Sequence, residues 1–185
     1  QRQVAHTLER LGQPKALSLL TAIAAINPDV TVVPVTQRAD AALLAKLVAQ
    51  ADVVLDCTDN FATRHAINRA CVALGKPLVS GAASRLDGQL SVYDPRDAAS
   101  PCYACVFPEN SGVEETRCAT MGVFAPLVGI IGTMQAAEAL KLLMGIGRSL
   151  AGRLQMLDAR SMEWTEIAMQ RQSQCPVCTA ERGAA

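Results

Sequence analysis

Apolar and polar positions along the chain follow two periods, one typical of helices and one of strands. Residues 7–26 and 39–49 are rich in Ala and Leu at helical spacing, and the first segment contains a glycine and a proline near which we expect a kink. Residues 30–35 are β-branched and predict a strand, although the proline inside it favours an edge position. Residues 52–57 form an apolar run with an acid near its end, and such a run is typical of a strand buried on both faces of a parallel sheet.

The second half of the pattern repeats this alternation. Asp59 or Asn60 is placed to cap a helix that ends before Gly75. The remaining elements are predicted as strands at 77–82 and 89–93, a long helix at 122–144, and paired strands at 153–158 and 164–169. Helices alternating with short strands predict an α/β fold with a mainly parallel sheet. The length of 185 residues suits a single domain over residues 1–185, or one large domain with a small appendage.

The most apolar stretch, residues 123–134, matches a buried core helix and is too short to span a bilayer. Its continuation carries Gln135, Glu138 and Lys141 at a spacing of three, a polar stripe typical of a soluble helix. The chain opens with polar residues and shows no signal peptide. We therefore expect a cytoplasmic protein with no membrane partner.

Composition narrows the function classes further. Seventeen Lys and Arg balance seventeen Asp and Glu, so the formal charge is zero and a nucleic-acid partner is not expected. Half of the 185 residues are hydrophobic, which is enough for a sizeable core. Aromatic residues make up only 3%, so stacking on bases or sugars is not expected to dominate recognition.

Four of the seven cysteines stand in two C-x-x-C pairs, at residues 102–105 and 175–178. An odd number of cysteines without a secretion signal argues against a disulfide framework. Two such pairs can complete a closed tetrahedral site of four thiolates, so we predict structural zinc on Cys102, Cys105, Cys175 and Cys178. The site would pin the C-terminal tail to the irregular segment before residue 120. A thioredoxin-like redox pair and unligated thiols are the alternatives.

The other cysteines carry different expectations. Cys118 lies in a polar loop beside Arg117, where it is either a nucleophile of lowered pKa or an ordinary surface cysteine. Cys57 and Cys71 fall in strand and helix patterns and are predicted to be inert core residues.

Two acids, Asp56 and Asp59, lie at the end of the strand predicted at 52–57. Ligands of open α/β sheets bind beyond the carboxyl ends of the strands, and a carboxylate there can hold a Mg²⁺ that bridges nucleotide phosphates. Alternatively, Asp59 or Asn60 caps the next helix and Asp56 is a hydrogen-bonded loop carboxylate.

Several short motifs occur in a fixed order along the chain. They are Gln-Arg-Gln at 1–3, Gly-Gln-Pro-Lys at 12–15, Ile-Asn-Pro at 26–28, Asp-Cys-Thr-Asp-Asn at 56–60, Pro-Leu-Val-Ser-Gly at 77–81, the two C-x-x-C pairs, and Gly-Val-Phe-Ala-Pro-Leu-Val-Gly at 122–129. In this order they closely resemble the ThiF/MoeB/HesA family, the bacterial relatives of ubiquitin-activating enzymes. Each motif is weak alone, but the combination is specific and spans nearly the whole chain. The resemblance implies a Rossmann-like sheet with a zinc-stapled C-terminal part.

The resemblance also implies an adenylyltransferase. Such an enzyme binds Mg-ATP and a ubiquitin-like sulfur-carrier protein ending in Gly-Gly, adenylates the terminal carboxylate of the carrier, and releases pyrophosphate. It serves thiamin or molybdopterin-type sulfur transfer and is implied to be a homodimer. The family pattern places Arg2 and Lys15 on ATP phosphates and Asp59 on the metal near the reacting phosphate, while Asp56 stays structural.

The paired cysteines match the zinc ligands of the family. Cys118 matches the loop cysteine that is linked to sulfur transfer in ThiF-like members and is not thought to be needed in MoeB-like members.

One departure from the family pattern concerns the nucleotide site. Family members carry a strand and a Gly-rich turn before the Gln-Arg-Gln segment, whereas this chain begins at Gln1 and contains no G-x-G-x-x-G. We therefore expect the C-terminal portion of a longer chain, with weak or no ATP binding as it stands. The alternative function is a non-catalytic, zinc-bearing dimerisation and carrier-docking fragment. An NAD-dependent oxidoreductase would need the missing glycine motif and would leave both cysteine pairs unexplained.

Overall fold

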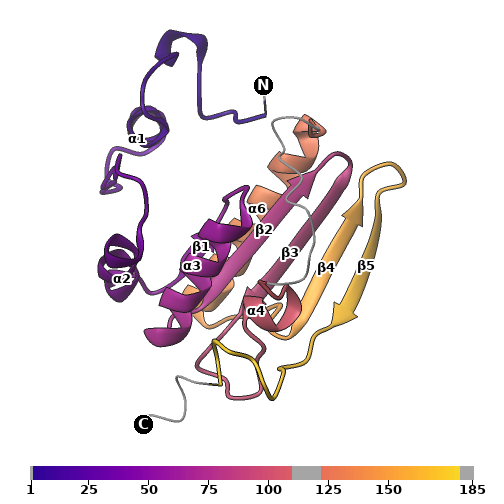
Figure 1. Cartoon of the computed structure of the whole chain (residues 1–185). Coiled ribbons are helices and arrows are strands. Elements are labelled where there is room, and N and C mark those ends of the chain that lie inside the picture. The colour runs from indigo at the N-terminus through magenta and orange to yellow at the C-terminus, as the bar shows by residue number, and fades with distance from the viewer. Residues whose placement is uncertain (1, 110–121, 180–185) are drawn as a thin grey trace. The chain divides into compact units, whose positions relative to one another are not determined.

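The computed structural model describes residues 2–109 and 122–179 (Figure 1). The chain divides into two compact units, Gln1–Ala39 and Asp40–Ala185, which are described one after the other. The prediction of a single ThiF/MoeB-like domain over residues 1–185, as the C-terminal portion of a longer chain, stays a prediction.

The first unit is helical where the sequence predicts a helix, but the helix is in two pieces. A 3-10 helix, η1 (Leu8–Arg10), is followed by α1 (Lys15–Ile26), because Gly12 adopts a left-handed φ of +83° and Pro14 stands at the N-cap. The strand predicted at 30–35 is wrong, since these residues lie in no strand. A β-branched segment favours extended backbone, but a strand also needs a partner for its N–H and C=O groups. Within the described part of this unit no second strand is present.

The second unit is built on one sheet, and the predicted α/β class is confirmed. Its described strands run in the order β1 (Val54–Asp56), β2 (Leu78–Ser84), β3 (Asp87–Tyr93), β4 (Arg153–Asp158) and β5 (Glu163–Ala168). The β1–β2 pair is parallel and the three following pairs are antiparallel, so the described sheet is mixed and not mainly parallel as predicted. Short turns join β2 to β3 and β4 to β5, and such turns suit only antiparallel neighbours. The β1–β2 connection instead passes through a helix, α3 (Phe61–Ala73).

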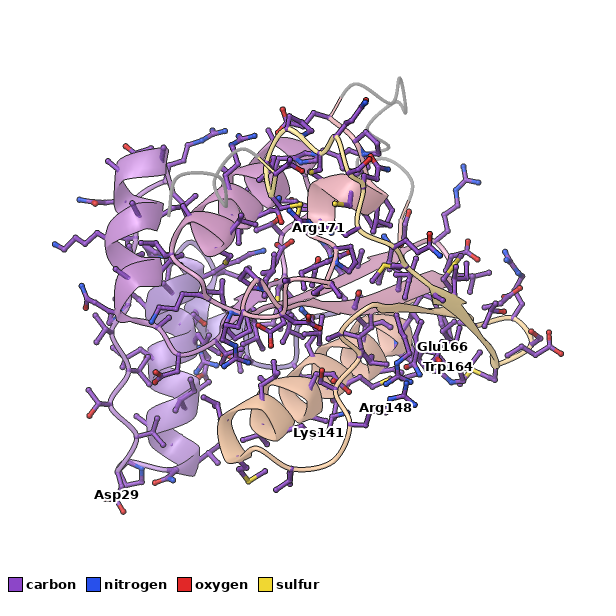
Figure 2. The ribbon with its side chains drawn as sticks, turned by 90° about the horizontal axis from the view of Figure 1, so that it is seen from below. Asp29, Lys141, Arg148, Trp164, Glu166 and Arg171 are labelled. Carbon is purple, nitrogen blue, oxygen red and sulfur yellow. The ribbon has the colours of Figure 1, made fainter. Side chains whose placement is uncertain are left out.

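Helices cover both faces of this sheet (Figure 2). On one face, Leu78 and Tyr93 pack against residues of α2 (Ala41–Gln50), α3 and the short helix α4 (Tyr103–Val106). On the other, Val79 and Val92 pack against α6 (Ala125–Met144). Because successive residues of a strand point to opposite faces of the sheet, β2 and β3 each contribute side chains to the hydrophobic cores on both faces.

Helix α6 extends well beyond the apolar run seen in the sequence. It begins with Pro126 in its first turn and ends at Gly145, whose φ is +64°. By length and composition alone it could cross a membrane, and it is the single such helix among the described residues. That is weak evidence, since core helices pass the same test. Moreover, Gln135 and Glu138 of its polar stripe are buried against the protein.

The glycines of the sheet set how closely α6 approaches it. A Cβ atom at Gly81 would lie 2.5 Å from Oε1 of Gln135, and one at Gly88 would lie 2.9 Å from Cδ1 of both Leu127 and Ile131. Gly81 therefore makes room for a polar side chain of α6, and Gly88 makes room for apolar ones.

Candidate functional site

The carboxyl end of β1 carries a buried carboxylate with a complete set of partners. Asp56 is 1% exposed. Its Oδ1 accepts hydrogen bonds from the backbone N (2.9 Å) and Oγ1 (2.7 Å) of Thr58, and its Oδ2 accepts one from Oγ of Ser80 at 3.3 Å. Nε of Arg64 lies 4.0 Å from the same Oδ2. These partners compensate the cost of burying the charge, which makes Asp56 a structural residue.

The loop that follows is held from both faces of the sheet. From α3, Nη2 of Arg64 donates to the carbonyl of Thr58 at 2.5 Å. From α6, Nε2 of Gln135 donates to the carbonyls of Asp56 at 2.8 Å and Val79 at 3.3 Å. The position of residues 57–60 is thus fixed by buried side chains from two helices.

Asp59 stands on this fixed loop and has a different environment. Its side chain is exposed and makes no hydrogen bond or ion pair with any residue that the structure describes. The helix cap is Asn60, whose Oδ1 accepts from the backbone N of Thr63 at 2.8 Å. Asn60 is therefore the capping residue, and the carboxylate of Asp59 faces solvent in the short loop between β1 and α3.

Cys57 lies beside this acid, and its prediction as a core residue is wrong. The residue is exposed, although desolvation of its thiol and the charge of Asp56 raise its pKa. The turn out of β1 brings residue 57 to the surface. Cys71 is buried as predicted, and desolvation raises its pKa to about 12, so it is inert.

The predicted phosphate ligands Arg2 and Lys15 both lie in the first unit and are exposed. Lys15 is the first residue of α1, and no side chain caps this helix within the described residues. The start of α1 is held in its unit by Ser18, whose Oγ receives a hydrogen bond from Nε of Arg10 at 2.9 Å. Because each unit is described by itself, the prediction that these two residues share a site with Asp59 stays a prediction.

The four paired cysteines converge, although about 70 residues separate the two pairs along the chain. All four are buried, and their sulfur atoms lie within 4.8 Å of one another. The Sγ–Sγ distances are 3.9 Å for Cys102–Cys105, 3.6 Å for Cys102–Cys175 and 3.6 Å for Cys105–Cys178. A zinc ion about 2.3 Å from four sulfurs sets tetrahedral edges of about 3.8 Å, so the arrangement fits such an ion.

Several N–H groups around the cluster are directed toward its sulfur atoms. Nδ2 of Asn68 lies 3.7 Å from Sγ of Cys102, and the backbone N of Gln172 lies 3.5 Å from Sγ of Cys105. Nε of Arg171 lies 3.5 Å from Sγ of Cys178. Burial raises the pKa of Cys102. Burial also acts to raise the pKa of Cys178, but hydrogen bonds from Arg171 and the neighbouring sulfurs outweigh it and lower that pKa.

The remaining predicted residue, Cys118, lies outside the described residues. Three residues that the sequence did not single out, Arg64, Asn68 and Arg171, complete the two regions together with Gln135, which was predicted only as part of a polar stripe. A signal was available for the pair on α3, because polar residues four positions apart share one helix face and this face also carries Ile67 and Cys71. A polar residue on an apolar face is the mark of a buried hydrogen-bonding role.

The model of the ThiF family matches residues 1–177. The chain belongs to the ThiF family. It is 44% identical over 181 residues to the molybdopterin-synthase adenylyltransferase of Escherichia coli (strain K12), covering 96% of this chain and 71% of that protein. It is 45% identical over 178 residues to the sulfur carrier protein ThiS adenylyltransferase of the same strain, covering 96% of this chain and 70% of that one.

Among solved structures, E. coli MccB with ATP shares the fold, with a TM-score of 0.79 at 20% identity. That match covers 96% of this chain and 54% of the MccB chain, so this ThiF-family chain spans about half the length of that neighbour.

Proposed function

We propose that this ThiF-family chain belongs to an enzyme that uses ATP to adenylate the C-terminal glycine of a ubiquitin-like sulfur-carrier protein. The observation that carries the proposal is the identity of 44–45% to two adenylyltransferases over 96% of the chain. The alternative, a non-catalytic docking and dimerisation fragment, has no comparable support.

The proposed reaction joins two anions. A carboxylate oxygen of the carrier attacks the α-phosphorus of ATP, the bond from that phosphorus to the bridging oxygen breaks, and pyrophosphate leaves. The attacking carboxylate is already ionised near neutral pH, so no general base is needed. The main requirement is positive charge that offsets the repulsion and stabilises the leaving group.

We assign that charge to three residues of the chain. Arg2 and Lys15 are exposed cations, and Lys15 opens a helix whose first N–H groups also favour an anion. Asp59 would hold Mg²⁺, because it is an exposed carboxylate on a fixed strand end without another partner among the described residues. A bound Mg²⁺ supplies charge compensation at the phosphates.

The proposed cofactor of the cysteine cluster is zinc, on the four sulfurs whose spacing fits a tetrahedral ion. The burial that raises the pKa of Cys102 would keep a free thiol protonated, so a cation is the natural partner for four thiolates there. We also propose a cytoplasmic homodimer, and the exposed apolar residues Leu140, Leu143 and Met144 of α6 support an additional buried surface.

The test is ATP–pyrophosphate exchange with the longest natural form of the protein that contains residues 1–185. Exchange should require a carrier ending in Gly-Gly and vanish when the last glycine is removed from the carrier. Asp59→Ala should abolish exchange while zinc content stays unchanged. No exchange with any Gly-Gly carrier would reject the enzyme and favour the docking fragment.

A second experiment addresses the pathway. If the chain follows ThiF-like chemistry, Cys118→Ser should block sulfur transfer to the carrier and leave adenylation intact. If both steps survive, the chain follows the MoeB-like branch.

A further inference from the structure

We propose that Arg171 and Asn68 are positioning residues of the cysteine cluster, which donate N–H groups to two of its sulfurs and slow the loss of a metal ion held there. This inference rests on the proposed zinc site. It concerns residues that lie outside both C-x-x-C pairs.

Arg171 makes three contacts around one edge of the cluster. Its Nε points to Sγ of Cys178 at 3.5 Å, its Nη2 donates to the carbonyl of Cys178 at 3.0 Å, and its Nη1 donates to the carbonyl of Ala98 at 3.1 Å. Figure 2 shows the labelled Arg171 beside side-chain sulfur atoms. The planar fork of one guanidinium therefore ties the second cysteine pair to the loop before the first.

The charge of the guanidinium also matters. Four thiolates around one Zn²⁺ carry a net charge of −2, which is costly in a buried site. Within the described residues, Arg171 is the one cation that contacts a sulfur of the cluster. A charge-assisted N–H bond withdraws electron density from the sulfur and stabilises the anionic centre.

Asn68, on α3, contacts a different sulfur of the cluster, that of Cys102, and its orientation is fixed. Its Oδ1 accepts a hydrogen bond from the backbone N of Tyr103 at 2.9 Å. Because a backbone N–H needs an acceptor, the oxygen of the amide must face Tyr103, and the NH₂ group must face Sγ of Cys102, which lies 3.7 Å away. Asn68 is 1% exposed, so neither group can turn to water.

The test compares substitutions in the whole chain. Arg171→Gln removes the charge and the fork, Arg171→Lys keeps the charge alone, and Asn68→Asp keeps the acceptor for Tyr103 but replaces the donor to Cys102. Arg96→Gln is the matched control, because Arg96 forms an exposed ion pair with Asp94. That pair lies in the same loop as Ala98.

Two quantities are measured: the rate of zinc transfer to a colorimetric chelator, and the sulfur-to-metal charge-transfer bands of the cobalt-substituted protein. Arg171→Gln and Asn68→Asp should release zinc about tenfold faster or more, with Arg171→Lys between them and the wild type. Their cobalt bands should move to lower energy, because the sulfur lone pairs lose an N–H partner. A purely structural role would leave these bands in place. Arg96→Gln should match the wild type in both measurements.

The outcomes separate this inference from the proposal on which it rests. Wild-type protein without zinc would reject the zinc site and the inference together. Zinc-loaded wild type with unchanged release rates and bands in the variants would reject the inference alone. If Asn68→Asp does not fold, the two Arg171 substitutions carry the test, since this residue is only half-buried.

Discussion

The cysteine cluster and the end of β1 are two polar regions of the same unit. They differ in whether every functional side chain finds a partner among the described residues. All four sulfurs of the cluster are buried and meet one another. At the end of β1, one carboxylate, Asp56, is buried with protein partners, whereas another, Asp59, stands three positions later without a described partner. A group that the fold satisfies serves stability, and a group that the fold holds rigidly but leaves unsatisfied is available to a ligand.

The largest effect is expected from disrupting the cysteine cluster. Cys175→Ser removes one of the four predicted ligands, and because loss of a structural metal is among the few changes that exceed about 4 kcal/mol, the free energy of unfolding should fall by at least that much. Zinc content by mass spectrometry and unfolding in urea would measure both consequences. The matched control, Cys57→Ser, changes an exposed cysteine outside the cluster and should retain zinc. A Cys175→Ser protein that keeps wild-type zinc and stability would contradict the assignment.

The contrast between the two acids can be tested directly. Asp56→Ala leaves Arg64 buried without its carboxylate, and breaking such a pair costs about 3 kcal/mol or more in the free energy of unfolding. Asp59→Ala removes an exposed side chain and should change the free energy of unfolding by less than about 0.5 kcal/mol. Urea unfolding of the two variants side by side is the measurement. If both substitutions lower the free energy of unfolding equally, the distinction between a structural Asp56 and a ligand-binding Asp59 is wrong.

A smaller effect is expected at the helix that leaves this strand end. Asn60→Ala removes the cap of α3 and should lower the free energy of unfolding by about 1 kcal/mol, because the N–H of Thr63 loses its acceptor. Asn60→Ser keeps a capping oxygen and should recover most of that loss. Thermal unfolding would separate the two, and the cap assignment fails if serine and alanine behave alike.

The smallest effect concerns pH and lies on α3, between the two regions. Burial lowers the pKa of His65, and the nearby Glu109, whose Oε1 is 3.5 Å from Nδ1, only partly opposes this. The unfolded chain therefore binds the proton first, and the free energy of unfolding should fall as the pH drops through about 6.5.

His65→Gln should remove this part of the pH dependence. Unfolding in urea at about pH 8 and about pH 5.5 would be compared between the variant and the wild type, so that protonation of the cysteines cancels in the difference. Identical pH slopes would exclude a lowered pKa for His65.

What the sequence predicted well had a local cause. The C-terminal end of α1 at Ile26, the approximate extent of α2 and the two cysteine pairs depend on residues only a few positions apart. In α2, for example, Asp40 caps the helix by accepting a hydrogen bond from the backbone N of Leu43. What it missed depends on partners far along the chain. The segment 30–35 lacks a partner strand among the described residues of its unit. Gln135 matches a polar stripe in the sequence, but its hydrogen-bond partners are the carbonyls of Asp56 and Val79, which lie far away along the chain.

The close approach of Gly81 to Gln135 has a consequence for how these positions can evolve. A side chain at position 81 would occupy the space of the Gln135 amide, and a shorter residue at position 135 would give up the hydrogen bonds to Asp56 and Val79. Neither position can therefore change freely without the other. Across related sequences we expect the two to covary, with glycine at 81 wherever glutamine is at 135 and a larger residue at 81 only where residue 135 is small.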